Sequence, residues 1–188
     1  MNLTVEDIYT IYPELDWILD ANLRKKCVDA FLSVAEKGGW NRETYQKCPL
    51  TLTIQAEDVP KLVEHIRAVT TIAAKSYEAL KGIYQTDGKL WDTIIAGALM
   101  HDIGKFLEFS LDNEGRGRSS DTADILRHPI CGAIQAAQVG LPDEIVHIIA
   151  THSFEGKASY KTIAAKIVGS ADETAFNYAT YLIKNGGE

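Results

Sequence analysis

Apolar residues recur at helical spacing through most of this chain, and this recurrence most constrains its fold. The clearest stretch follows Asp58-Val59-Pro60, where a capping residue and a proline suit the first turn of a helix. Its apolar positions are Leu62, Ile66, Val69, Ile72, Ala73 and Leu80. Comparable stripes occupy the ranges 20–35, 90–102, 128–137, 143–152 and 161–184. Because no stretch alternates with period two for long, the sequence predicts an all-α fold, a single-domain helical bundle.

The predicted helices belong to one compact domain. The 188 residues are enough to bury a core without disulfide staples, and neither repeats nor linkers interrupt the sequence. Residues 58–188 carry all the candidate functional side chains. We therefore expect residues 1–57 to form an N-terminal helical extension that packs on the core formed by residues 58–188.

The charge of the chain limits the partners that it can bind. A formal net charge of -7 disfavours nucleic-acid polymers and anionic membranes, because it adds to phosphate repulsion. A small anionic or polar substrate remains compatible if positive charge gathers locally, for example at a metal. Whether the chain forms a homo-oligomer is left open.

The sequence favours a cytoplasmic location. No apolar run approaches the ~18 residues of a membrane span, and the first residues do not resemble a signal peptide. The three cysteines, Cys27, Cys48 and Cys131, are odd in number and lack CxxC spacing. Such a set suits a reducing compartment.

A histidine and an aspartate, His101 and Asp102, follow directly on the apolar run that ends at Met100. Neighbours on a helix point about 100° apart, so this pair can share one ion only if other elements bring further ligands. The residues that could do so are His65, His128, His152 and Asp172. Neutral imidazoles and carboxylates, with a position left for water, are the ligands of a catalytic divalent ion.

Each of these residues also has a structural interpretation when it is taken alone. His65 on an apolar helix face suits a hydrogen-bonded core residue, and His128 before a proline suits a helix cap. Asp172 suits an ion pair with a nearby lysine. The ordered set of six favours the metal site, in which Asp102 bridges two ions. His65, His101, Asp102 and Asp172 would then hold one ion, and His128 and His152 would complete the second site.

This ordered set resembles the HD-domain superfamily of metal-dependent phosphohydrolases, which are all-helical. The pattern of a histidine, then His-Asp, then a distal aspartate is met by His65, His101-Asp102 and Asp172. The segments His128-Pro129-x-x-Gly132 and Thr151-His152 are similar to those of two-metal members. The resemblance covers about residues 58 to 180 and implies an HD-type helical bundle with its metal site in the core.

The resemblance implies a metal-dependent hydrolase, a phosphohydrolase or phosphodiesterase that acts on a small nucleotide-like phosphate ester or anhydride through a metal-bound hydroxide. His101-Asp102-Ile103-Gly104-Lys105 looks like the variant in cyclic-dinucleotide phosphodiesterases, but Ser153-Phe154-Glu155-Gly156 departs from their Gly-Tyr-Pro motif. Two alternatives stay open. One is an HD-type metalloenzyme with a non-phosphate substrate, acting by ring opening, carbon–carbon cleavage or di-iron oxygenation. The other is a non-catalytic nucleotide-binding module.

Four cationic side chains are candidates for contact with the substrate. The resemblance gives Lys105, three residues after Asp102, a catalytic role in stabilising negative charge; its alternative is an ordinary lysine at a helix end. Arg116 and Arg118 lie in a polar, glycine-rich stretch, residues 110–121, which predicts a mobile surface loop. They could close over an anionic substrate or remain solvated. Arg127 adjoins His128.

The ligand types restrict the metal without identifying it. Histidine and carboxylate ligands without thiolate fit one or two divalent ions, with manganese or iron favoured and zinc, nickel or cobalt compatible.

Overall fold

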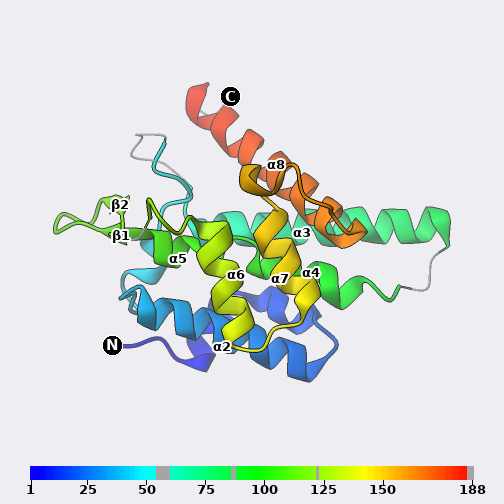
Figure 1. The fold of residues 1–188 in the computed structure, drawn as a ribbon, viewed down its shortest axis with the longest axis horizontal. Coiled ribbons are helices and arrows are strands. Elements are labelled where there is room, and N and C mark those ends of the chain that lie inside the picture. The colour runs from blue at the N-terminus through cyan, green and yellow to red at the C-terminus, as the bar shows by residue number, and fades with distance from the viewer. Residues whose placement is uncertain (54–59, 86–87, 122, 186–188) are drawn as a thin grey trace.

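The computed structural model describes residues 1–53, 60–85, 88–121 and 123–185, and within them the chain is mostly helical (Figure 1). This confirms the prediction of an all-α fold. The α-helices are α1 (Val5–Ile11), α2 (Ala21–Lys37), α3 (Leu62–Tyr84), α4 (Trp91–Met100), α5 (Lys105–Glu108), α6 (His128–Gln138), α7 (Asp143–Thr151) and α8 (Ile163–Lys184). Short 3-10 helices are η1 (Pro13–Trp17), η2 (Tyr45–Lys47) and η3 (Phe154–Gly156). No helix in these ranges is long and apolar enough to cross a membrane.

The long helices pack around one another so that their inner faces meet. Helix α3 packs against α4 and α8, while α6 and α7 lie side by side and α7 also contacts α4 and α8 (Figure 1). Helix α4 is buried along its whole apolar length, from Ile94 to Met100. A helix that is apolar on all sides is stable only at the centre of a bundle. The residues that directly follow α4 therefore lie in the interior of the bundle.

The N-terminal segment packs on the side of this bundle that carries α5. Phe31 of α2 stacks on Tyr12, and Tyr45 stacks on Phe106 of α5, both with ring centroids 4.2 Å apart. Tyr12 and Tyr45 also meet edge to face, with centroids 6.4 Å apart. Each such aromatic pair contributes about 0.5–1.5 kcal/mol to the stability of the fold, beyond the contribution from burying its apolar area. The row of four rings joins the N-terminal segment to α5, while the division of the chain at residue 57 stays a prediction.

Local signals account for the beginnings of several elements. Thr4 and Asp7 form the two hydrogen bonds of a capping box at α1, and Asp20 caps α2 through the amides of Asn22 and Leu23. The expected start of α3 at Asp58-Val59 falls outside the described residues. Within the described part, α3 begins at Leu62, two residues after Pro60.

Most of residues 110–121, which we expected to form a mobile surface loop, belong to a short β-hairpin, and their mobility stays a prediction. Strand β1 (Phe109–Leu111) pairs antiparallel with β2 (Gly117–Ser119). The Asp112 carboxylate accepts hydrogen bonds from the amides of Glu114 and Arg116, which closes the turn. Gly115 adopts a φ of 78° there, a conformation that costs glycine little. Strands of three residues are too short to produce a visible alternation in the sequence.

Burial predicts that the thiols react slowly in the folded protein. Burial raises the pKa of Cys131 to about 11 and that of Cys27 to about 12, and it also raises the pKa of Cys48. For a pKa of about 11, only about one thiol in a thousand is ionised at pH 8, and the thiolate is the reactive form. We expect a coloured disulfide reagent at pH 8 to label no cysteine rapidly until guanidinium unfolds the chain, when three react. A thiol that reacts in the native protein as fast as free cysteine would contradict this packing.

Candidate metal centre

The His-Asp pair lies in a four-residue turn, residues 101–104, between α4 and α5. The His101 Nδ1 donates to the carbonyl oxygen of Ala98 at 2.6 Å, which directs Nε2 towards Asp102 and His65. Gly104 permits the close approach of α6, because a Cβ there would lie 2.0 Å from the carbonyl oxygen of His128. Glycine is therefore required at position 104 to bring His128 beside the turn. Helix α5 begins directly after it, at Lys105.

One group of ligand atoms comes from α3, the turn and α8. The Nε2 of His65 lies 3.0 Å from Asp172 Oδ1 and 3.5 Å from Asp102 Oδ2. The Nε2 of His101 lies 3.4 Å from Asp102 Oδ2 and 3.8 Å from Asp172 Oδ1. The two histidine Nε2 atoms are 3.4 Å apart. These four residues form a group that could hold a metal ion.

A second group uses the other oxygen of the same aspartate. Asp102 Oδ1 lies 3.4 Å from His128 Nε2 and 3.3 Å from His152 Nε2. These three buried residues also could hold an ion. The structure thus brings together all six residues that the sequence singled out, and Asp102 gives one carboxylate oxygen to each group.

The spacing and chemistry of these atoms suit divalent ions. Ligands about 2.1 Å from a shared ion lie roughly 3.0–3.4 Å apart in octahedral or tetrahedral geometry, close to the separations observed. The buried Oδ2 of Asp102 forms an ion pair with the Lys105 ammonium at 2.7 Å and accepts no other hydrogen bond among the described residues. A cation between these atoms would satisfy the oxygen and the facing nitrogen lone pairs together.

Hydrogen bonds to the outer ring nitrogens orient the histidines. His152 Nδ1 donates to the carbonyl oxygen of Ile149 at 2.8 Å, as His101 does to its own helix. His128 is the first residue of α6, so it has no preceding helical carbonyl to use. The Glu108 carboxylate takes that place, accepting from His128 Nδ1 at 2.7 Å and from its amide at 2.8 Å. Such an outer partner fixes the tautomer and raises the basicity of the ligand nitrogen.

Sequence reasoning missed Glu108. It lies six residues beyond Asp102 on a different helix from His128, and nothing in its surroundings along the chain distinguishes it from a surface glutamate. Its carboxylate is buried, and its other oxygen accepts from Arg127 Nε at 2.6 Å. Burial favours a raised pKa for Glu108, but His128 and Arg127 outweigh it and hold the pKa below the ordinary value.

Burial and neighbouring charges set the protonation of the centre. Burial would raise the pKa of Asp102, but Lys105 and His101 hold it well below the ordinary value. Burial lowers the pKa of His65 and of His128, against the smaller opposing effect of their carboxylate partners. For His101, Asp102 outweighs burial and the pKa is raised. The Asp102 carboxylate is therefore ionised, and a divalent cation would displace the proton that the raised pKa favours on His101.

A cavity of about 810 Å³ opens above the centre. Asp102, Lys105, His128, His152 and Asp172 lie in its lining. Lys105 is therefore placed where a substrate would lie. The rest of the lining comprises Arg127, Ser153, Phe154, Glu155, Lys157, Lys161, Ala165, Lys166, Gly169, Ser170, Glu173 and Phe176.

The three candidate arginines occupy different places. Arg127 lies in the cavity wall, paired with Glu108 and, at 3.8 Å, with Glu155. Arg116 lies in the hairpin turn and pairs with Asp112 and Glu114. Arg118 is exposed on β2, and neither hairpin arginine is in the cavity lining. Contact of these arginines with a substrate stays a prediction.

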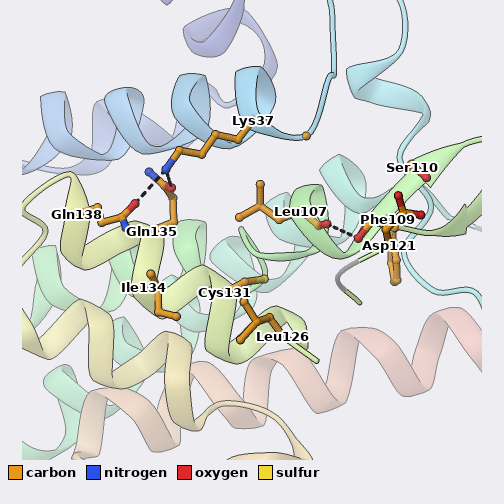
Figure 2. A pocket seen from close by; sticks show the side chains of 12 residues that line it. Lys37, Leu107, Phe109, Ser110, Asp121, Leu126, Cys131, Ile134, Gln135 and Gln138 are labelled. Atoms are coloured by element: carbon orange, nitrogen blue, oxygen red, sulfur yellow. Dashed lines mark hydrogen bonds between the residues drawn. The ribbon is translucent and has the colours of Figure 1, made fainter. Parts of the chain in front are cut away.

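Another hollow, of about 410 Å³, lies beside α5 and α6 but contains none of the six candidate ligands (Figure 2). Lys37 reaches across it from α2 and donates to the side-chain oxygens of Gln135 and Gln138. Leu107 and Cys131 line the wall between these groups and the hairpin. Both acceptors are neutral amides, so the lysine is hydrogen-bonded but these partners do not neutralise its charge.

The fold and the site define a helical domain with a buried histidine–aspartate centre that could hold metal. A family model described as the HD domain matches residues 62–177, which is more than half of the chain. The chain therefore belongs to the HD domain family, as the ordered set predicted. Four of the elements that supply the centre, α3, α4, α6 and α7, and the first part of α8 fall within the match.

A curated relative gives a second comparison. The chain is 33% identical over 113 residues to a protein of Methanocaldococcus jannaschii named dihydroneopterin 2',3'-cyclic phosphate phosphodiesterase. The similar region covers 60% of this chain and 45% of the relative, so it spans less than half of that protein. No solved structure matches the chain.

The contact between Glu108 and His128 can be tested through metal binding. We expect Glu108→Gln to weaken binding of the ion held by Asp102, His128 and His152 about 10–100-fold and to leave the other ion nearly unchanged, because His128 is the one candidate ligand that Glu108 contacts among the described residues. Calorimetric titration of chelator-stripped protein with Mn²⁺ would measure both affinities.

Glu36→Gln, on the exposed face of α2, is the matched control, and circular dichroism would verify that each variant is folded. Two unchanged Mn²⁺ affinities in Glu108→Gln would show that this carboxylate does not orient a ligand.

Proposed function

We propose that the protein is a metal-dependent phosphohydrolase that cleaves a phosphodiester of a small nucleotide-like molecule. One observation carries the proposal: the two oxygens of Asp102 face two separate sets of donors, with His65, His101 and Asp172 on one side and His128 and His152 on the other. A carboxylate shared in this way would hold one divalent ion on each side. Membership in the HD domain family supports the same reading.

The relative suggests which phosphate to test first. Its printed name assigns it a 2',3'-cyclic phosphate, a small phosphodiester. A cyclic phosphate needs a cavity open above the metal centre, and the hollow of about 810 Å³ is large enough for a small ligand. We infer that a nucleoside or pterin 2',3'-cyclic phosphate is the first substrate class to test.

Each side chain of the centre would have its own role in the reaction. Divalent ions held by the two sets would activate water and neutralise charge on the phosphoryl oxygens. Asp102 fixes the spacing of the two sets, and Glu108 holds His128 in the tautomer that presents Nε2. Lys105, whose ammonium lies 2.7 Å from Asp102 Oδ2, would donate to a phosphoryl oxygen and stabilise its developing charge. Manganese and iron are the ions that we favour.

Removing the negative charge of the shared Asp102 carboxylate should weaken metal binding at both sets of donors. We expect Asp102→Asn to retain less than one bound Mn²⁺ per chain and to lose at least about 100-fold in the hydrolysis of adenosine 2',3'-cyclic phosphate. Metal analysis after dialysis and a product assay by chromatography are the measurements. Asp29→Asn, which breaks only a surface pair with Lys25, is the matched control. Normal activity in Asp102→Asn would overturn the proposal.

The two-ion arrangement can be separated from a one-ion arrangement. His152→Ala removes one donor of the smaller set and leaves His65, His101 and Asp172 intact. We expect the bound Mn²⁺ to fall from two per chain towards one, with activity reduced about 10–1,000-fold. Calorimetry and metal analysis provide the count. A wild-type protein that binds a single ion, with the same value in the variant, would show that the second set is not a metal site.

A further inference from the structure

The cavity extends from the metal centre along one face of α8. Its wall on that helix runs from Ala165 past Gly169 to Asp172 and Phe176. Ala165 and Gly169 are small, and a Cβ at Gly169 would meet only the carbonyl oxygen of His152, at 3.6 Å. A Cβ at Gly169 would therefore make only an ordinary contact, and Ala165 beside it is fully buried. This part of the wall lies towards the N-terminal end of α8.

Three lysines line this part of the cavity without a carboxylate partner. Lys166 lies on α8, and Lys157 and Lys161 lie on the segment that leads into it. No ion pair among the described residues involves any of the three, whereas Arg127 in the same wall is paired with Glu108 and Glu155. This accumulation is unexpected in a chain of net charge -7. The remaining acidic residue of the lining, Glu173, lies beside Asp172 at the other end.

On α8, Lys166 is set back from Asp172, the candidate ligand of the same helix. Lys166 precedes Asp172 by six residues, which corresponds to about 9 Å along the axis of α8. Lys105 already supplies an ammonium group at the centre itself. The two positions therefore fit two separate anionic groups on one small molecule.

We propose that Lys157, Lys161 and Lys166 form a distal anion subsite, and that the substrate carries a second phosphate or carboxylate apart from the scissile phosphate. The identity of the scissile group rests on the proposed function. The subsite itself rests on the three lysines, which line the same cavity as the metal centre and have no carboxylate partner among the described residues.

Binding of two product analogues tests the subsite without any need for turnover. Adenosine 3'-monophosphate and adenosine 3',5'-bisphosphate differ only in a phosphate distant from the position at the metal centre. With Mn²⁺-loaded protein, we expect calorimetry to show that the bisphosphate binds at least about tenfold more tightly at low salt. The advantage should shrink as sodium chloride is raised.

The same titration of two triple variants tests which lysines cause the tighter binding of the bisphosphate. Lys157→Gln, Lys161→Gln and Lys166→Gln together should remove the bisphosphate advantage and leave the affinity for the monophosphate within about threefold. Lys47→Gln, Lys81→Gln and Lys184→Gln together make the same charge change at exposed positions outside the cavity, so they should preserve the advantage. A bisphosphate that binds no more tightly than the monophosphate, or an advantage retained by the first triple variant, would overturn the subsite.

Hydrolysis assays keep this inference distinct from the proposed function. Wild-type protein is assayed with adenosine 2',3'-cyclic phosphate and with its 5'-phosphorylated counterpart. Tighter binding of the bisphosphate without hydrolysis of either cyclic compound would contradict the phosphodiesterase activity and leave the subsite standing. Hydrolysis of both with equal kcat/KM, together with equal binding of the two analogues, would sustain the activity and refute the subsite.

Discussion

The rest of the structure is arranged around the buried carboxylate of Asp102. A lone charge at that depth would be very unfavourable, and it persists because one ammonium and four imidazoles surround it. Those groups come from elements that are distant along the sequence. Placing them requires α3, α6, α7 and the turn after α4 to meet at one point, so the packing of the bundle and the chemistry of the site share a single constraint.

The hydrogen bonds that orient the candidate ligands differ in whether donor and acceptor belong to the same helix. His101 and His152 donate to carbonyl oxygens of their own helices, so each ring is oriented as soon as its helix forms. His128 depends on Glu108 from another helix. The orientation of Glu108 depends in turn on α5, which is held by the stacked rings of Tyr45 and Phe106 and by the bond from Trp40 Nε1 to the Phe106 carbonyl oxygen at 2.6 Å. The N-terminal segment thereby stabilises one half of the candidate metal centre.

Much of the centre was predictable because its members are of types that rarely occur together by chance. Four histidines and two aspartates in order along the chain indicated the ligands, and the apolar periods placed their helices. Glu108 was not predictable, because its role depends on a contact between helices and not on its neighbours in sequence. The hairpin at residues 109–119 was missed for a different reason: three-residue strands are stabilised by pairing with each other, and pairing leaves little trace in either strand alone.

The sequence by itself determined the helical class, because that class depends on local periodicity, and it indicated the six candidate ligands through their ordered resemblance to the HD-domain pattern. Only the tertiary structure decided which oxygen of Asp102 faces which histidines, and that Lys157, Lys161 and Lys166 share one wall with the centre. Those facts depend on distances of a few ångströms between separate helices. Such distances are set by how whole faces pack, which no single stretch of the chain encodes.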